Sequence, residues 1–581
     1  MAAKDVIGLK ESSKLMLGYP AILVNATQGQ QPGKMSKMSA TQEKSPNKSS
    51  CESFDAIVVG AGFAGLAMLN RLRKQGLSVR VLEAGSGVGG TWYWNRYPGA
   101  RCDVESIEYS YQFDENLQQE WDWTERYARQ PEILKYLNHV ADRFDMRKDI
   151  QFNTRVKSAV FNEATNRWTV TTENGGSMTA TYCVMATGCL SAPNTPVFKG
   201  SDSFKGEIYH TGKWPHEGVD FTGKRVGIIG TGSSAIQSIP IIAEQAKHLT
   251  VFQRTPNYSV PAANRPMDQK LQKEIKADYA AFRERENQQQ TAFGSRFQAS
   301  DVAMLEISKA ERDAIYEKYW QIGGLLFLYA SSDLLLNKDA NETAAEFIRE
   351  KIRSIVKDPE TAKLLSPDTV VGCKRLCADT GYYETFNRPN VKLVDVRSAP
   401  IEELTPKGLR TTNAEFELDC IVFATGFDAM TGSLLRMDIR GRKGLTLQQK
   451  WAEGPRTYLG LTTVGFPNMF IVSGPGSPSV LTNMVPSIEQ HVNWIAGAIS
   501  DLRERQLSCI EPVVEAENAW VDHVNEVAGY TLFPTCNSWY LGANIPGKPR
   551  VFMPYLGFPA YVEKCNQVRA AGYEGFALSK A

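Results

Sequence analysis

The 581-residue chain lacks an excess of charge of either sign. Its 65 basic and 64 acidic side chains leave a formal net charge of +1, so no broad field is available to hold nucleic acid or an anionic membrane. Its apolar runs are short as well: the best candidate, 325–336, is interrupted by Ser331, Ser332 and Asp333, and no membrane span is expected. These absences favour small molecules as partners, and they leave the oligomeric state open.

The chain also lacks a CxxC pair among its ten cysteines. Several of them, such as Cys183 and Cys420, lie in apolar runs that resemble strands, so we expect reduced core cysteines and a cytoplasmic location. Cys373 and Cys377 are close in sequence, but they flank Lys374-Arg375 and do not match the redox pair of a disulfide reductase. No metal site is predicted.

Two segments have the pattern of a βαβ unit. In the first, a short apolar run at 55–60 precedes a helical pattern over 64–74 and a strand over 78–83. In the second, the run 225–230 leads into a helix and then into a strand over 249–253.

Two more apolar runs, 182–188 and 419–426, both end in Ala-Thr-Gly and are predicted to be the returning strands of these units. The chain therefore contains two candidate nucleotide-binding folds built on one plan.

The first unit carries a dinucleotide fingerprint. Gly60, Gly62 and Gly65 follow the strand and open the helix, where they permit a tight turn and let backbone N–H groups reach a pyrophosphate. Glu83 ends the second strand, and a carboxylate there accepts hydrogen bonds from ribose hydroxyls and disfavours a 2′-phosphate. This favours FAD or NAD over NADP.

The second unit ends differently. Gly230, Gly232 and Ala235 form the variant glycine motif, but Arg254 and Thr255 replace the acidic residue at the strand end. A guanidinium at that place can form charge-assisted hydrogen bonds with a phosphate. NADPH is therefore the predicted second nucleotide, and the two folds together predict hydride transfer from NADPH to a flavin.

The sequence thus predicts an α/β fold with two Rossmann-like dinucleotide-binding domains. Residues 1–52, rich in Lys, Ser, Gln and Asn, are expected to be a disordered extension. We expect 53–190 to form the first part of the FAD domain and 191–390 the NADP domain, with a helical insertion at about 268–368. Residues 391–581, in which strand and turn signals return after Leu404, are expected to complete the FAD domain and to end in a C-terminal loop.

A further motif lies between the two glycine motifs. Residues 204–215 contain the pattern FxGxxxHxxxWP, with its defining residues at Phe204, Gly206, His210, Trp214 and Pro215. This pattern resembles the fingerprint of the type I Baeyer–Villiger monooxygenases. The segments 89–106 and 538–548 also resemble this family's flavin-side loop and C-terminal loop, and the resemblance runs from about Phe54 to the C-terminus.

The resemblance implies an FAD-containing enzyme that uses NADPH and O2 to insert an oxygen atom beside a ketone carbonyl, giving an ester or lactone through a C4a-peroxyflavin. It implies that Arg375 is the catalytic cation and that Asp103 orients it. The chemistry also calls for such a cation, because an anionic peroxide and a developing oxyanion both need a fixed positive charge.

The resemblance further implies contacts for the bound molecules. Those to the cofactors involve Gly60, Gly62, Gly65, Glu83, Thr91, Trp92, Tyr93, Trp94, Asp103, Tyr109, Val156, Gly230, Thr231, Gly232, Ser233, Ser234, Gln237, Arg254, Thr255, Lys374, Arg375, Met484 and Trp539. Val480, Leu481 and Met484 are expected to line the substrate site, with core packing as the alternative reading. His210 is expected to couple domains rather than to transfer protons.

Two alternatives remain open. A flavin-containing N- or S-oxygenating monooxygenase shares both glycine motifs but usually lacks the Trp214-Pro215 ending. A non-catalytic flavin-binding protein would be expected to have lost Asp103 or Arg375, and both are present.

Overall fold

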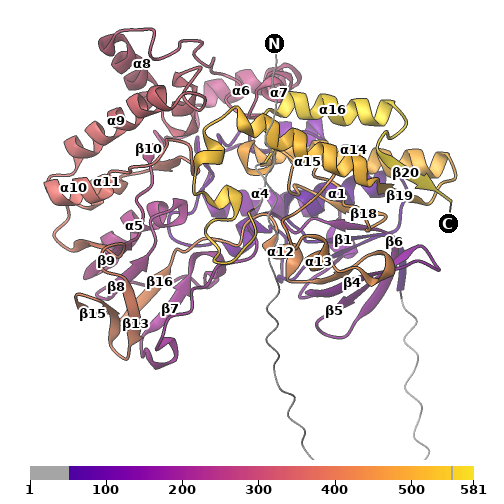
Figure 1. The fold of residues 1–581 in the computed structure, drawn as a ribbon, viewed down its shortest axis with the longest axis horizontal. Coiled ribbons are helices and arrows are strands. Elements are labelled where there is room, and N and C mark those ends of the chain that lie inside the picture. The colour runs from indigo at the N-terminus through magenta and orange to yellow at the C-terminus, as the bar shows by residue number, and fades with distance from the viewer. Residues whose placement is uncertain (1–51, 551–553, 581) are drawn as a thin grey trace, which may run out of the picture. The chain divides into compact units, whose positions relative to one another are not determined.

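The computed structural model describes residues 52–550 and 554–580, so the extension predicted over 1–52 lies outside the described residues except for its last position. The first sheet is centred on β1 (Glu52–Val59), which lies between β6 (Ser177–Met185) and β2 (Val79–Leu82) and is parallel to both. Helix α1 (Phe63–Lys74) connects β1 to β2 (Figure 1). The first predicted βαβ unit and its returning strand are confirmed.

The other strands of this sheet come from later parts of the chain as well as from nearby. The order is β17-β4-β5-β6-β1-β2-β3, with β18 beside β6. The added strands are β3 (Ile150–Gln151), β4 (Val156–Asn162), β5 (Arg167–Thr172), β17 (Asp438–Arg440) and β18 (Met469–Ile471). Because β17 and β18 belong to the last third of the chain, that third completes the first sheet as expected.

The second sheet has the strand order β12-β9-β8-β16-β7, and all its neighbours are parallel. Its elements are β7 (Glu207–His210), β8 (Arg225–Ile229), α5 (Ser233–Gln245), β9 (His248–Gln253), β12 (Val391–Asp395) and β16 (Cys420–Phe423). The returning strand predicted at 419–426 is confirmed. The boundary predicted at 390 is wrong, because residues 391–423 supply two strands to this sheet.

Between β9 and β12 the chain forms the predicted helical insertion. Its helices are α6 (Gln269–Ala277), α7 (Tyr279–Gln288), α8 (Lys309–Ile322), η4 (Gly324–Ala330), α9 (Lys338–Ile355) and α10 (Pro359–Leu365). Aspartate, serine and asparagine side chains accept hydrogen bonds from the first-turn N–H groups of α6, α7, α8, α9 and α10.

The strand and turn signals expected after 404 describe that part of the chain incompletely. It also contains three long helices, α14 (Met484–Glu504), α15 (Val514–Gly529) and α16 (Phe558–Ala570). Ile488, Val492, Ile495, Ile499 and Leu502 of α14 are buried at helical spacing against α1 and its neighbours.

Further elements connect these parts. They are α2 (Thr91–Trp94), α3 (Glu115–Glu120), α4 (Gln130–Arg143), β10 (Ser259–Pro261), β11 (Cys377–Asp379), α11 (Tyr382–Thr385), β13 (Ile401–Thr405), β14 (Gly408–Thr411), β15 (Glu415–Glu417), α12 (Gly432–Leu435), α13 (Leu447–Lys450), β19 (Cys509–Pro512) and β20 (Phe576–Ser579).

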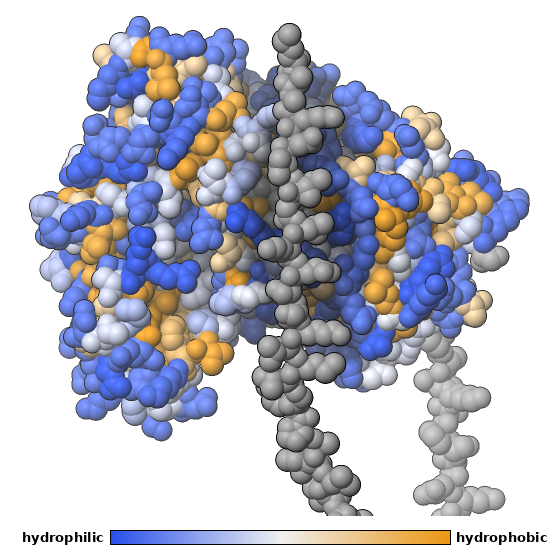
Figure 2. Space-filling view, in the orientation of Figure 1, coloured by the Kyte–Doolittle hydropathy of each residue, from blue (hydrophilic) through white to orange (hydrophobic). Residues whose placement is uncertain are grey.

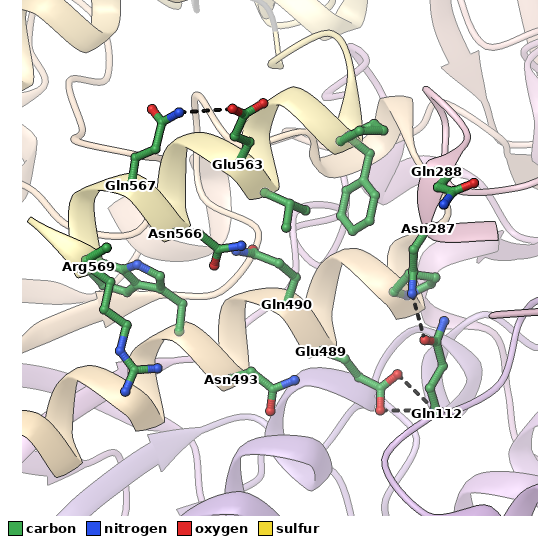
Figure 3. A pocket seen from close by; sticks show the side chains of 16 residues that line it. Gln112, Asn287, Gln288, Glu489, Gln490, Asn493, Glu563, Asn566, Gln567 and Arg569 are labelled. Atoms are coloured by element: carbon green, nitrogen blue, oxygen red, sulfur yellow. Dashed lines mark hydrogen bonds between the residues drawn. The ribbon is translucent and has the colours of Figure 1, made fainter. Parts of the chain in front are cut away.

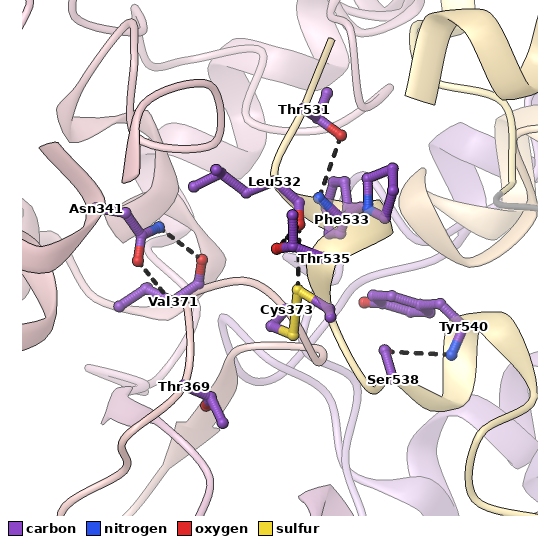
Figure 4. The surroundings of a disulfide bond; sticks show 12 residues. Asn341, Thr369, Val371, Cys373, Thr531, Leu532, Phe533, Thr535, Ser538 and Tyr540 are labelled. Carbon is purple, nitrogen blue, oxygen red and sulfur yellow. Dashed lines mark hydrogen bonds between the residues drawn. A yellow bond between two sulfur atoms is a disulfide. The ribbon is translucent and has the colours of Figure 1, made fainter. Parts of the chain in front are cut away.

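The expectation that all cysteines are reduced is wrong for one pair. Cys373 and Cys536 form a disulfide, with their Cα atoms 5.6 Å apart (Figure 4). The bond closes a span of 163 residues, and no local spacing motif announces a pair so far apart. Seven other described cysteines are free and buried, Cys183 and Cys420 among them.

The outer surface carries hydrophilic residues with small hydrophobic groups between them, as Figure 2 shows for one face. The exposed large hydrophobic residues are scattered along the chain, as Val197, Ile208, Leu305 and Tyr530 illustrate. Among the described residues, no helix combines the length and the apolar character needed to cross a bilayer.

Candidate active site

The turn between β1 and α1 is shaped to approach a phosphate group closely. Gly60 has φ +105°, and a Cβ there would lie 2.6 Å from the carbonyl oxygen of Ala186 at the end of β6. A Cβ at Gly65 would lie 1.8 Å from the carbonyl oxygen of Gly60. Gly62 precedes helix α1 and provides no side-chain cap, and the first turn has no acidic residue, so its N–H groups are available to a pyrophosphate. These residues fit FAD.

Glu83 lies at the end of β2, next to this turn. Its carboxylate accepts hydrogen bonds from the N–H groups of Ala61 and Gly85, each at 2.7 Å. Burial raises the pKa of Glu83, and these two N–H groups oppose the rise. The side chain is therefore fixed where the sequence predicts a ribose contact, although the contact itself stays a prediction.

The flavin-side loop lies on the same turn. Gly62 approaches Gly90 so closely that a Cβ at Gly62 would lie 3.3 Å from the Gly90 Cα, and α2 follows with Thr91 exposed. The Trp92 indole donates to the Tyr109 hydroxyl at 3.3 Å.

Two neighbouring rings and one strand end complete the predicted FAD contacts. The Tyr93 hydroxyl accepts from the Ser86 N–H at 3.0 Å, and the Tyr93 and Trp94 rings meet edge to face. Val156 is buried at the start of β4. The structure thus brings the glycine turn, Glu83 and the segment 89–93 together at the ends of β1 and β2, and their contacts with FAD stay a prediction.

The second sheet has a glycine turn of the same shape, between β8 and α5. We call these two turns, at Gly60 and Gly230, the nucleotide cradles. Gly230 has φ +117°, and a Cβ there would lie 2.4 Å from the carbonyl oxygen of Ala424 at the end of β16. The Ala-Thr-Gly repeat thus has a physical reason, since each returning strand ends against the first glycine of its motif. Gly232 precedes helix α5 and provides no side-chain cap, and the Thr231 hydroxyl donates to the Thr255 carbonyl at 2.9 Å.

The helix α5 residues predicted to bind NADP lie at the same turn. Ser233 contacts the Cys377 sulfur at 3.2 Å, and Ser234 contacts the Thr211 hydroxyl at 3.2 Å. Gln237 instead accepts a hydrogen bond from the Tyr97 hydroxyl at 2.9 Å, which joins α5 to the flavin-side loop.

Two cations, Arg254 and Lys374, complete the predicted phosphate site. Arg254 is exposed, and neither it nor Lys374 forms an ion pair with any residue that the structure describes. Burial, and then the nearby charge of Arg254, lower the pKa of Lys374. Two like charges held close together favour an anion between them, as the predicted 2′-phosphate site requires.

Arg375 is held by three hydrogen bonds. Its Nε and Nη2 atoms donate to the two carboxylate oxygens of Asp103, each at 2.9 Å, and its Nη1 donates to the Val480 carbonyl at 2.7 Å. Burial alone would lower the pKa of Arg375, but the charge and hydrogen bonds of Asp103 hold it above its usual value. The guanidinium is therefore permanently charged and fixed in orientation.

An apolar cluster lies beside this guanidinium. Its buried members include Val480, Met430 and Phe533, and partly buried Leu481, Met484, Trp539, Leu335 and Leu556 pack against them. The structure therefore places the predicted substrate-lining residues together with Trp539. Their contact with a substrate remains a prediction.

Tyr540 is a site residue that the sequence reading missed. It is buried in the apolar cluster, and its hydroxyl interacts with Arg375. Burial raises the pKa of Tyr540 to about 12, and the charge of Arg375 opposes this, so the phenol is neutral at physiological pH. Its position directly after Trp539 in the C-terminal loop was the available signal.

The fingerprint residues are hydrogen-bonded or packed beside β7. His210, at the end of β7, accepts a hydrogen bond from the Gly212 N–H at Nδ1 (2.9 Å) and lies 3.2 Å from the Asn194 carbonyl through Nε2. Phe204 and Trp214 are buried, and a Cβ at Gly206 would lie 2.3 Å from the Asp419 carbonyl oxygen. Pro215 follows and accepts from the Gly218 N–H at 3.2 Å.

We expect His210→Ala to lower the midpoint of urea unfolding at about pH 8, because two hydrogen bonds of about 1 kcal/mol each are lost. Burial lowers the pKa of His210 in the folded chain, so the unfolded chain takes up the proton first as the pH falls below about 6.5. The advantage of the wild type should therefore shrink at about pH 5.5. If the difference in urea midpoint between the wild type and His210→Ala grew at acid pH, the imidazole would not be neutral in the folded chain.

A separate cavity of about 750 Å³ lies between α14, α16 and the end of α7 (Figure 3). Amide side chains such as Gln112, Asn287 and Asn493 line it together with Glu489, whose carboxylate accepts from the Gln112 N–H. Burial raises the pKa of Glu489 to about 7. None of the predicted site residues lines this cavity.

Known proteins resemble the chain over most of its length. Residues 57–306 match a family model described as pyridine nucleotide-disulphide oxidoreductase. A Baeyer–Villiger monooxygenase of Pseudooceanicola batsensis is 47% identical over 90% of this chain and 95% of its own, and a phenazine N-monooxygenase of Lysobacter antibioticus is 46% identical over 90% and 97%.

A solved structure of an oxidised steroid monooxygenase bound to NADP is 55% identical, with a TM-score of 0.87, and covers 91% of this chain and 100% of its own. Identity at this level over nearly the whole length, together with both nucleotide cradles and the fingerprint, fixes the family. The chain belongs to the Baeyer–Villiger monooxygenases and is an FAD- and NADPH-dependent oxidoreductase.

Proposed function

We propose that Arg375, oriented by Asp103, is the cation that supports oxygen transfer to a ketone in this enzyme. The observation that carries the proposal is the bidentate ion pair at 2.9 Å, fixed further by the Val480 carbonyl and set beside an apolar cluster. Such a guanidinium pays no reorganisation cost when negative charge develops on a reacting oxygen.

Bound FAD, once reduced by NADPH, supplies the activation of O2 in this chemistry. The chain's own residues bind, orient and shield. The cradles at Gly60 and Gly230 would hold the two pyrophosphates, while Arg254 and Lys374 would hold the 2′-phosphate. Asp103 keeps Arg375 aimed, and the apolar cluster excludes water and stray protons from the reacting oxygen.

The apolar lining supports an apolar ketone as substrate. The cluster sets aliphatic, aromatic and thioether side chains beside Arg375, and Met430 and Met484 are flexible enough to accommodate different shapes. NADPH consumption measured against cyclic, aryl and steroidal ketones, with mass spectrometry for the gain of one oxygen, tests the reaction and the substrate together. Consumption without any oxygenated ketone product would refute the proposal.

N-oxygenation is the second candidate, and the 46% identical phenazine N-monooxygenase favours it. The same screen with a phenazine and a thioether separates the two reactions. The cytoplasmic location predicted from the sequence also remains a proposal, supported by the free, buried cysteines in the described residues.

Replacing Arg254 with alanine is expected to raise the KM for NADPH by about 10- to 100-fold, because a charge-assisted hydrogen bond contributes about 1.5 to 3 kcal/mol. The KM for NADH should change little, since NADH lacks the 2′-phosphate. Steady-state kinetics with both cofactors measure this ratio. Arg436→Ala, at an exposed arginine outside the cradle, is the matched control. An unchanged cofactor preference would remove Arg254 from the phosphate site.

A further inference from the structure

The disulfide between Cys373 and Cys536 joins the two segments that meet at the candidate active site (Figure 4). Cys373 lies two residues before Arg375, and Cys536 lies three residues before Trp539. Both half-cystines are buried, each with a relative exposure of 4%. The covalent bond therefore connects the loop of the proposed catalytic cation with the segment that supplies Trp539 and Tyr540.

The loop that carries Cys373 has its own anchor. The side chain of Asn341, on α9, donates to the Val371 carbonyl at 3.0 Å and accepts from the Val371 N–H at 2.8 Å. The Cys373 N–H donates to the Val370 carbonyl at 3.1 Å. This half of the disulfide is thus fixed to the helical insertion whatever the state of the bond.

The C-terminal segment is held less firmly. Before the disulfide, the Leu532 N–H donates a hydrogen bond to the Leu335 carbonyl at 2.8 Å. After the disulfide, the Asn544 side chain donates one to the Phe427 carbonyl at 2.8 Å. Between these anchors, the hydrogen bonds described for the segment are local, apart from those that the Arg550 guanidinium donates to the Pro534 and Cys536 carbonyls, each at 3.1 Å. None of these bonds reaches the loop of Arg375, with which the Tyr540 hydroxyl interacts. The disulfide is therefore its covalent attachment to the loop of Arg375.

We propose that Cys373–Cys536 is a redox-sensitive tether, which holds Trp539 and Tyr540 on the loop of Lys374 and Arg375 when oxidised and releases them when reduced. The proposal rests on the proposed function, because it assumes that these two segments close together over bound NADP(H). Release would lower the population of the closed arrangement, and with it the retention of NADP⁺.

The redox step needs only simple reactants. A low-molecular-weight thiolate attacks one sulfur, forms a mixed disulfide with it and releases the other cysteine as a thiol. A second thiolate then attacks the mixed disulfide and releases the remaining cysteine, leaving two cysteine thiols and one external disulfide. In the reverse direction, hydrogen peroxide accepts two electrons from the thiol pair, and one S–S bond and two waters form. Lys374 directly follows Cys373 in the chain, and a neighbouring cation favours the reactive thiolate.

The first test is a peptide map of the full-length enzyme. After treatment with hydrogen peroxide and alkylation, a linked peptide containing Cys373 and Cys536 is expected. After dithiothreitol, both cysteines should instead be alkylated. Absence of the linked peptide under oxidising conditions would overturn the tether. Because burial makes exchange depend on opening of the segment, saturating NADP⁺ should slow the reduction.

The second test compares NADP⁺ release from the oxidised and the reduced holoenzyme. We expect release to be about tenfold faster after reduction, as it would be if the closed arrangement fell to about one tenth of its population. Cys536→Ser should release NADP⁺ at the rate of the reduced wild type and should not respond to dithiothreitol. Cys565→Ala, which removes a free buried cysteine on α16, should respond like the wild type. Equal rates for the oxidised and reduced wild type would refute the proposal.

These readouts separate the tether from the proposed function. The peptide map and the release rate do not depend on ester formation. If Arg375→Ala still formed ester, the proposed role of Arg375 would be refuted and the tether would remain supported by its own tests. If oxidised and reduced enzyme behaved alike while Arg375→Ala lost ester formation, only the tether would fall.

Discussion

The Arg375→Ala variant is expected to consume NADPH and to reduce its flavin at a rate close to that of the wild type, yet to form ester at least about 100-fold more slowly. Reduction by NADPH needs no cation at this place, whereas the negative charge that develops on the transferred oxygen does. Electrons that no longer reach the ketone should appear as hydrogen peroxide. Stopped-flow absorbance follows the reduction, and chromatography with mass spectrometry quantifies the ester.

Two further variants show whether the loss comes from the missing cation. Removal of Arg375 leaves Asp103 as a partly buried carboxylate without its partner, which is costly in itself. The double variant Arg375→Ala, Asp103→Ala removes that penalty and should remain inactive. Arg375→Lys keeps the charge but loses the pair of N–H groups that bind both carboxylate oxygens of Asp103, so it should recover only part of the activity. Robust ester formation by either alanine variant would remove Arg375 from the chemistry.

The nucleotide cradles could be predicted from the sequence because their geometry is local. Gly60 and Gly230 need positive φ, and each follows a strand at a spacing that few other structures require. The Ala-Thr-Gly repeats can also be recognised in the sequence. In the structure their alanines, Ala186 and Ala424, lie against these two glycines. Short-range constraints of this kind leave a short-range pattern.

The long-range features left no such pattern. Arg375 and Asp103 are 272 residues apart, and only the family resemblance paired them. Cys373 and Cys536 are 163 residues apart, and neither lies in a spacing motif, so the disulfide was missed. Spatial contacts of this kind depend on how the two sheets and the C-terminal segment pack, which no window of sequence encodes.

The domain boundary was misplaced for a related reason. Residues 391–395 lie beyond the long helical insertion, and the predicted boundary at 390 cuts the chain immediately before them. A parallel sheet can take its next strand from beyond any insertion, however, and β12 pairs with β9 across more than a hundred residues. The run 419–426 had already indicated that the second sheet continues past 391.

Replacing Gly60 with alanine is expected to yield an enzyme that is largely free of flavin. Gly60 has φ +105°, where alanine is strained, and the new Cβ would lie 2.6 Å from the Ala186 carbonyl oxygen, a backbone atom that cannot rotate away. The turn must then move away from β6, so the N–H groups at the N-terminus of α1 no longer point toward the pyrophosphate. We expect FAD to bind at least about tenfold more weakly.

Two matched variants isolate the cause. Gly76→Ala places alanine at φ +74° with no atom within 4 Å of the new Cβ, so it adds backbone strain without the clash and should retain FAD. Gly230→Ala repeats the clash in the second sheet, where the Cβ would lie 2.4 Å from the Ala424 carbonyl oxygen, and should weaken NADPH binding while FAD stays bound. The ratio of flavin to protein absorbance, with titration of the apoprotein by FAD, measures the effect. A Gly60→Ala enzyme purified with full flavin content would show that the close approach to Ala186 does not shape the FAD cradle.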